Sequence, residues 1–204
     1  MITAVLTPAP ADRLVVHLPS GPMDAAAFLA FCEANPELRI ERTAQGEVII
    51  MSPTGWESGR RNALLIAALV RWALANGSGA VADSSAGFRL PNGAMRSPDA
   101  AWVQRSRLAH FTRAEKRTFL PLCPDFVVEL RSETDRREDL LAKMDEYMAN
   151  GAQLGWLIDP LEQSVTIYRP DATPVRLERP ATITGDPELP GFTLELGSIW
   201  EPDL

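Results

Sequence analysis

The chain has 204 residues, of which 46% are hydrophobic, and its 20 Lys and Arg against 27 Asp and Glu give a formal net charge of −7. Disordered chains carry fewer apolar residues and domains commonly run to about 100–200 residues, so this composition excludes an unfolded chain and favours one globular domain over residues 1–204. The acidic total argues against a general coat of nucleic acid, because affinity for phosphate depends on Lys and Arg.

The sequence argues against a membrane-spanning helix, a signal peptide and a zinc site of the usual kind. No apolar run reaches the roughly 20 residues that a membrane-spanning helix needs, because Arg71 interrupts the longest candidate at 63–70. The first ten residues contain no Lys or Arg, so they lack the charged start of a signal peptide, and we expect a cytoplasmic protein with no membrane partner. Two cysteines and two histidines are too few for a usual zinc site, so a metal here would be held by oxygen.

The chain opens with a proline-rich segment, residues 1–22, which we expect to lie extended along the surface because proline pairs poorly inside a sheet. A helix is predicted over 25–34, with Asp24 as its cap, and an Asn-Pro pair directly after it ends the helix. Two β-prone segments then flank the turn 43–46 and predict an antiparallel hairpin over 38–51.

Two longer helices and a set of short strands are predicted in the rest of the chain. The first helix, 62–75, carries leucines at helical spacing and is closed by an Asn-Gly pair. The second, 135–150, has Asp135 and Glu138 as a capping pair and an apolar stripe that includes Tyr147. Helices that bracket a mixed sheet indicate an α/β or α+β architecture. Short strands are predicted at 80–82, 87–90, 99–103, 126–130, 155–158 and 165–168.

An acid inside the very apolar strand 126–130 is the strongest sign of a functional site. The carboxylate of Glu129 would cost several kcal/mol to bury alone, so a metal ion or a cation is expected beside it. Asp99 opens another strand, and two carboxylates with a backbone carbonyl and waters form the oxygen-rich shell that Mg²⁺ prefers. Lys143 lies at the edge of the second helix's apolar stripe, from where its amine could reach both acids.

The same residues also have structural interpretations. Asp99 taken alone is more often a residue of a turn or cap. Glu129 could form a buried ion pair with Arg131 or another basic residue instead of binding a metal. Asp125 shares the face of Glu129 and is a competing ligand, and Lys143 could be an ordinary solvated lysine.

A local excess of positive charge follows the strand at 99–103. Between residues 104 and 117 the basic residues stand against a single acid, Glu115. Such a cluster suits contacts with a phosphate backbone and suits a solvated surface equally well. The candidates for nucleic-acid contact are Arg105, Arg107, Arg113, Lys116 and Arg117.

Several stretches of the sequence carry a resemblance to a known family. They are Arg-Ser-Pro-Asp-Ala-Ala-Trp-Val at 96–103, Pro-Asp-Phe-Val-Val-Glu-Leu-Arg-Ser-Glu-Thr-Asp at 124–135, Lys143 with Tyr147 and Gly151, Gly-Trp-Leu-Ile-Asp-Pro at 155–160, and the hairpin segment at 40–53. Over about residues 20–200 the chain resembles the Uma-two family, described as "putative restriction endonucleases" on the PD-(D/E)xK nuclease fold. The resemblance implies a restriction-endonuclease-like core at about 38–170, a mixed β-sheet flanked by helices, with an N-terminal β-hairpin.

The resemblance also implies an activity and a ligand set. It implies an endonuclease that hydrolyses DNA phosphodiester bonds with Mg²⁺, or Mn²⁺, as its cofactor. The metal ligands would be Asp99, Glu129 and the carbonyl oxygen of Leu130. Nuclease folds of this kind often place an extra acid near the metal, so Glu41 is a further candidate ligand and Glu47 a weaker one.

One position departs from the general nuclease motif, which has a lysine two residues after the acid. This chain has Arg131 there, and an arginine cannot give up its proton to act as a base. In this family the lysine lies on the helix, where Lys143 would help to position the attacking water. Two alternatives stay open: a catalytically silent binding or assembly module on the same fold, and an enzyme acting on a non-DNA phosphodiester. A homodimer is expected of an enzyme that cuts both strands.

Overall fold

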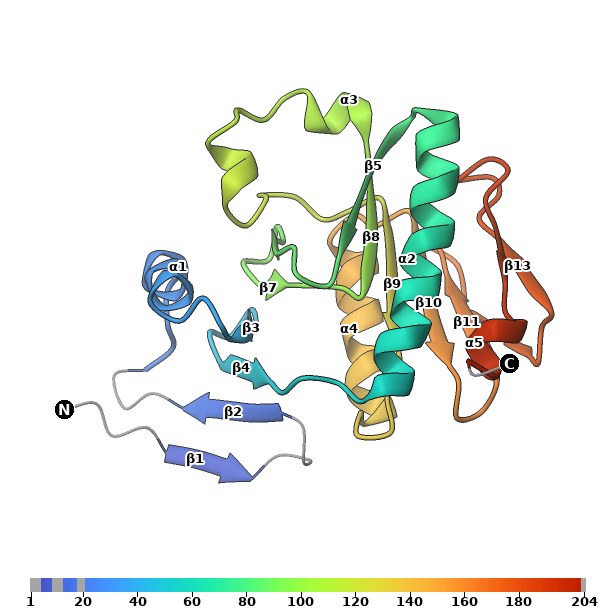
Figure 1. The fold of residues 1–204 in the computed structure, drawn as a ribbon. Coiled ribbons are helices and arrows are strands. Elements are labelled where there is room, and N and C mark those ends of the chain that lie inside the picture. The colour runs from blue at the N-terminus through green and yellow to red at the C-terminus, as the bar shows by residue number, and fades with distance from the viewer. Residues whose placement is uncertain (1–4, 9–12, 18–20, 203–204) are drawn as a thin grey trace.

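The computed structural model describes residues 5–8, 13–17 and 21–202. In this part of the chain the strands form two six-stranded sheets and a separate two-stranded ribbon, with helices packed against them (Figure 1). The predicted mixed α/β architecture is therefore confirmed. The described helices are α1 (Ala25–Ala34), α2 (Trp56–Asn76), α3 (Arg105–Leu108), α4 (Arg137–Ala149) and α5 (Gly197–Trp200), with one 3-10 turn, η1 (Glu115–Arg117).

The first sheet, called here the N-terminal sheet, is antiparallel at each described pairing. Its strands in spatial order are β1 (Val5–Pro8), β2 (Arg13–His17), β4 (Val48–Met51), β3 (Arg39–Arg42), β7 (Met95–Arg96) and β6 (Phe88–Arg89). The described parts of the segment 1–22 are extended, as expected, but they pair as the strands β1 and β2, which was not predicted. Pro8 is tolerated since β1 is the edge strand, and Pro10 and Pro19 lie outside the described residues.

The predicted first helix and the hairpin after it are confirmed. The side chain of Asp24 caps α1 by accepting a hydrogen bond of 2.8 Å from the backbone N–H of Ala27. β3 and β4 pair antiparallel, and Ile40 of β3 packs with Phe28 of α1 in a buried cluster. Because side chains alternate along a strand, Glu41 points to the other face of the sheet, away from α1.

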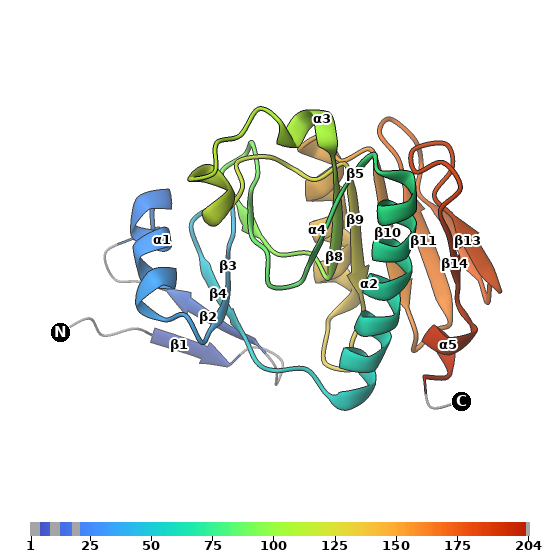
Figure 2. The same ribbon diagram turned by 45° about the horizontal axis from the view of Figure 1, so that its top comes forward.

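The second sheet, called here the central sheet, is mixed: β9 and β10 are parallel and the other described neighbours are antiparallel. Its strands in spatial order are β12 (Val175–Glu178), β11 (Ser164–Tyr168), β10 (Leu154–Asp159), β9 (Phe126–Leu130), β8 (Ala100–Gln104) and β5 (Gly79–Asp83). α2 and α4 cover its opposite faces (Figure 2). Phe126 and Val128 pack on the α2 side and Val127 on the α4 side, so alternation places Glu129 under α4, as predicted.

The two long helices, α2 and α4, are present, but the start of α2 and the cap of α4 differ from the predictions. α2 starts at Trp56, earlier than expected, and ends at Asn76; the capping residue Gly77 follows with a φ of 69°, the left-handed conformation that glycine adopts readily. The predicted capping pair of α4 is wrong. Asp135 accepts hydrogen bonds from the backbone N–H and hydroxyl of Ser132 in the preceding turn, so the helix begins after Arg136 without a side-chain cap.

The remaining predictions are met in part. The predicted strands are present as β5, β6, β8, β9, β10 and β11, whereas β7, β12 and the ribbon of β13 (Thr182–Thr184) with β14 (Thr193–Glu195) were not predicted. The basic segment between residues 104 and 117 contains the short helix α3 and the 3-10 turn η1. Among the described residues, no helix combines the length and hydropathy that crossing a bilayer requires.

Candidate active site

A cleft of about 990 Å³ opens between the N-terminal sheet and the first turns of α2 and α4. β4 runs through a short loop into α2 (Figure 1), and the residues of this loop, 52–55, line the cleft. The end of β9 and the residues just before β8 reach the same space. The charged residues lining the cleft include Arg39, Glu41, Arg96, Asp99, Glu129, Lys143 and Glu146.

The register of the central sheet brings the two predicted acids together. Ala100 of β8 lies opposite Val128 of the antiparallel strand β9, so continuing this register by one residue places Asp99 beside Glu129. The backbone N–H of Leu130 donates a hydrogen bond of 2.9 Å to Oδ2 of Asp99. Sheet pairing alone therefore puts two carboxylates and the backbone of Leu130 at one end of adjacent strands.

The helix α4 supplies the amine and a hydroxyl to this cluster. Nζ of Lys143 lies 2.9 Å from Oε1 of Glu129 and 2.9 Å from Oε1 of Glu41. One turn further along α4, the hydroxyl of Tyr147 donates a hydrogen bond of 2.9 Å to the same oxygen of Glu129. The side chain of Lys143 is only 14% exposed, so its interpretation as an ordinary solvated lysine is wrong.

Glu41 joins the cluster from the N-terminal sheet. Its Oε2 lies 3.1 Å from Nη1 of Arg96, and its Oε1 accepts a hydrogen bond of 2.9 Å from the backbone N–H of Ser97. Arg96 also pairs through Nε with Glu146 of α4, at 2.6 Å. The ion pairs of Arg96 with Glu146 and of Lys143 with Glu41 thus connect the N-terminal sheet with α4 across the cleft.

The acids of the cluster differ in their affinity for protons. Burial raises the pKa of Glu129 to about 8, with Asp99 and Glu41 adding to the shift and Lys143 opposing it. Burial also raises the pKa of Asp99, against the hydrogen bond from Leu130. Burial acts on Glu41 too, but Lys143 and the other donors bring its pKa below the ordinary value. Burial alone would lower the pKa of Lys143, but Glu129 and Glu41 raise it above the ordinary value.

These shifts indicate where positive charge is missing. Glu41 is well neutralised by its neighbours. For Asp99 and Glu129, the attraction of the Lys143 ammonium group does not offset the effect of burial. Asp99 forms no ion pair among the described residues. One buried and one partly buried carboxylate, both incompletely neutralised and next to a backbone carbonyl, are a donor set of hard oxygens, which fits a divalent cation such as Mg²⁺. In the described part of the chain, no group of three His, Cys, Asp or Glu side chains is arranged as a ready metal cage.

The two residues that competed for a place in the site are engaged elsewhere. Asp125 lies at the other end of β9, where it pairs with Nη1 of Arg107 at 2.7 Å and accepts a backbone N–H. Arg131 pairs with Asp159 at 2.7 Å. Arg131 is therefore not the base that pairs with Glu129, which forms its ion pair with Lys143, and Asp125 does not line the cleft.

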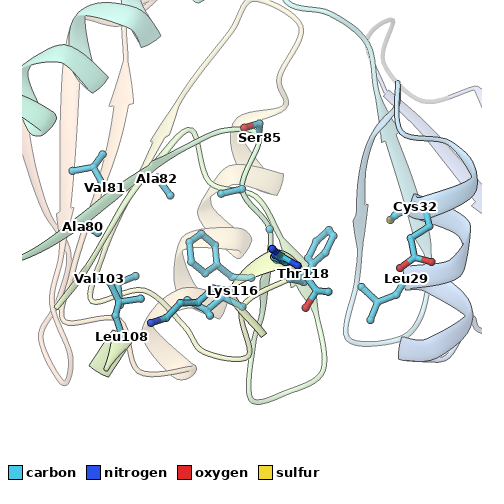
Figure 3. A pocket seen from close by; sticks show the side chains of 17 residues that line it. Leu29, Cys32, Ala80, Val81, Ala82, Ser85, Val103, Leu108, Lys116 and Thr118 are labelled. Atoms are coloured by element: carbon cyan, nitrogen blue, oxygen red, sulfur yellow. The ribbon is translucent and has the colours of Figure 1, made fainter. Parts of the chain in front are cut away.

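The predicted basic segment also lies away from the cleft. α3 follows the end of β8 that is opposite to Asp99 (Figure 1). Lys116 and Arg117 line a second pocket of about 580 Å³, together with apolar residues of α1 and β5 (Figure 3). None of the five basic candidates, Arg105, Arg107, Arg113, Lys116 and Arg117, is among the residues that line the cleft. Their contact with nucleic acid stays a prediction.

Three polar residues of the site were missed by sequence reasoning. The sequence marks Arg96 only as part of a segment that resembles the family, gives no sign of Glu146, and predicts Tyr147 in the apolar core. Tyr147 is indeed buried, but its hydroxyl serves Glu129. The available signal was its spacing, four residues after Lys143 on a helix whose other face is exposed. Glu47, the weaker acid candidate, does line the cleft.

A comparison with solved structures identifies the fold. A crystal structure described as a "putative nuclease belonging to DUF820", from Anabaena variabilis, superposes with a TM-score of 0.70 over 79% of this chain and 89% of that chain. The two sequences are 18% identical, so this likeness establishes the nuclease-type fold and no more. The family model Uma2, described as "Putative restriction endonuclease", matches residues 25–197, and the chain belongs to this family. No curated protein matches the chain.

Proposed function

We propose that this protein is a metal-dependent endonuclease that hydrolyses phosphodiester bonds of DNA in the cleft beside Asp99 and Glu129. One observation carries the proposal: the two carboxylates meet at the ends of β8 and β9 while Lys143 lies 2.9 Å from Glu129. Two carboxylates and one ammonium group therefore line a single cleft of about 990 Å³, which supports the proposal. Membership of a family described as restriction endonucleases supports DNA as the substrate.

In this mechanism each residue of the cluster has a separate task. Asp99, Glu129 and the carbonyl oxygen of Leu130 would hold a Mg²⁺ or Mn²⁺ ion, which would supply Lewis-acid chemistry: polarisation of a phosphate and a lower pKa for a water. The ammonium group of Lys143 orients the water and stabilises negative charge on the phosphate during attack. Glu41 holds Lys143 and Arg96 in place, and Tyr147 fixes the orientation of Glu129.

The role of Glu41 differs from the simplest form of the prediction. Both of its carboxylate oxygens already accept hydrogen bonds, Oε1 from Lys143 and Ser97 and Oε2 from Arg96. We therefore assign Glu41 chiefly to positioning the amine. As a direct metal ligand it would have to give up one of these contacts.

The test is cleavage of plasmid and linear DNA with Mg²⁺ or Mn²⁺ by the wild type and by Asp99→Asn and Glu129→Gln. We expect the wild type to cleave and both variants to lose cleavage. Asp145→Asn is the matched control, because it makes the same charge change at an exposed residue of α4 outside the cleft. Cleavage that survives both substitutions would point to a contaminant and would refute the proposal.

A thermal measurement separates the enzyme from a catalytically silent module. If the cluster binds metal, Mg²⁺ or Mn²⁺ raises the Tm of the wild type but raises that of Asp99→Asn less, because ligands that bind only the folded state stabilise it. No cleavage and no metal-dependent rise in Tm would favour the silent module. Competition by RNA and by single- and double-stranded DNA distinguishes a non-DNA phosphodiesterase. A homodimer stays our prediction and is measured by light scattering.

A further inference from the structure

Trp56 is the first residue of α2, and its indole stands at the wall of the cleft. Its exposed fraction is 77%, in a chain whose other four tryptophans are buried or partly buried. Single exposed apolar residues are common on protein surfaces and need no explanation. Trp56 differs from the other large exposed apolar side chains, Leu38, Leu74, Leu161 and Val175, because it alone among them lines the cleft.

The cleft that Trp56 lines also has an apolar strip next to the acids. Val15 of β2 with Ile49 and Met51 of β4 line the cleft, while the alternate residues of these strands pack against α1. The antiparallel register places Ile49 directly opposite Glu41 on β3. A partly exposed apolar surface therefore adjoins the charged cluster within one cavity.

Two polar atoms along this surface have no partner. Nε of Arg39 is buried and makes no hydrogen bond among the described residues, and the same holds for Oδ1 of Asn62 on α2. Both residues line the cleft, and the register sets Arg39 opposite Met51. Both side chains are partly exposed to the cleft, so they offer a bound ligand a guanidinium, which suits an anion, and an amide, which suits a hydrogen-bonding base.

A ligand that matches this surface has a phosphodiester, a flat apolar face and exposed N–H groups. In a double helix the bases are stacked on one another, and only their edges reach the grooves. In a single strand the faces of the bases are free to stack on aromatic side chains. The apolar strip thus matches unpaired bases better than it matches the outside of a duplex.

We propose that the cleft binds a single-stranded or locally unpaired segment of nucleic acid, with one base stacked on Trp56 and its neighbours against the apolar strip. This inference rests on the proposed function and names the substrate class of that same site. Arg39 contacts a phosphate of the bound strand, and the amide oxygen of Asn62 accepts a hydrogen bond from a base. Trp56 acts through binding and takes no part in the bond cleavage.

The experiment measures binding of fluorescently labelled oligonucleotides of about 12 nucleotides, with Ca²⁺ in place of Mg²⁺ to slow hydrolysis. The probes are a single strand, the duplex of the same sequence, and a single strand that carries abasic sites. We expect the wild type to bind the single strand more tightly than the duplex. Replacing bases by abasic sites weakens binding by about 5- to 150-fold, the range measured for stacking of one base on an aromatic side chain.

Variants assign this effect to the indole. Trp56→Ala loses the same factor on the normal strand and no longer distinguishes it from the abasic strand, whereas Trp56→Phe retains most of the affinity. Leu74→Ala is the matched control, because Leu74 is 81% exposed on the same helix and lies outside the cleft. Because Trp56 is exposed, its substitution leaves the Tm unchanged. Quenching of tryptophan emission by the single strand should disappear in Trp56→Ala.

The possible outcomes separate this inference from the proposed function. If metal-dependent cleavage requires Asp99 and Glu129 but Trp56→Ala binds and cleaves as the wild type does, the stacking inference is overturned and the nuclease stands. A preference for duplex, or equal binding of abasic and normal strands, overturns it in the same way. If the wild type neither binds nor cleaves any nucleic acid, both proposals fail.

Discussion

Substitution of Lys143 measures how much its ammonium group, the only amine of the charged cluster, contributes to the stability of the fold. The chain contains only two lysines, Lys116 and Lys143, and Lys143 is the buried one. We consider Lys143→Met, which keeps an unbranched side chain of similar length and removes the ammonium group. The substitution leaves Glu41 and Glu129, each with a side chain only 4% exposed, without the cation that bridges them.

The expected cost follows from the loss of both contacts at once. Removing one partner of a buried ion pair destabilises a protein by about 3–5 kcal/mol, because the other partner stays buried without compensation. Glu129, whose pKa is raised to about 8 by burial and its acidic neighbours, can take up a proton and limit the loss. Glu41 keeps Arg96 and Ser97. We therefore expect a loss of about 3 kcal/mol, the low end of that range.

The assay is unfolding by urea and by heat with a chelator present. For a chain of this length, 3 kcal/mol corresponds to a fall in Tm of roughly 6–12 °C. Lys116→Met is the matched control: it makes the same substitution at an exposed residue and should change stability by less than about 0.5 kcal/mol. Added Mg²⁺ should restore part of the loss in Lys143→Met, because the carboxylates then bind the dication without competition from the amine.

One result would refute this reasoning. If Lys143→Met unfolds in the chelator with a free energy within about 0.5 kcal/mol of the wild type, the 2.9 Å contacts of its amine contribute nothing to the fold. The excess of acids would then have to be neutralised in some other way. The assignment of Lys143 to the centre of the cluster would fail with it.

Two further substitutions test the site and the sheet that supports it. Tyr147→Phe removes the hydrogen bond to Glu129 and should lower stability by about 1.5–3 kcal/mol in urea unfolding. It should also weaken metal-dependent cleavage, and unchanged cleavage would exclude a positioning role for the hydroxyl. Gly79→Ala places a new methyl group against the ring of Trp102 in the neighbouring strand and should cost about 1–3 kcal/mol. Gly197→Ala, which meets nothing within 4 Å, should be nearly neutral by the same measurement.

The parts of the site that could be predicted from the sequence are those set by local periodicity. β9 is an apolar segment with one acid, so strand alternation alone assigned Glu129 to one face. Helical spacing placed Lys143 beside the apolar stripe of α4, which packs on that same face of the sheet. Their meeting follows from these two local patterns, because a strand followed by a helix packs that helix on an adjacent face.

The parts that could not be predicted depend on register between distant segments. Glu41 meets Arg96 across 55 positions and Lys143 across 102 positions of the sequence. No local pattern marks Arg96 as the residue that joins the N-terminal sheet to α4. The cap of α4 failed for a related reason: Asp135 has a choice of nearby backbone donors, and it bonds Ser132 within its own turn.

The arrangement of charges explains why the acids at the strand ends are the ones suited to hold a metal. Glu41 receives both cations of the cluster, Arg96 and Lys143, so it is neutralised before any ligand binds. Glu129 shares Lys143 with Glu41, and Asp99 accepts the backbone N–H of Leu130 but makes no ion pair among the described residues. Burying an uncompensated carboxylate is costly, so a chain selected for stability alone would pair or remove Asp99. This free-energy cost of burial arises where two carboxylates and a backbone carbonyl lie together. A bound dication is the simplest group that would offset it.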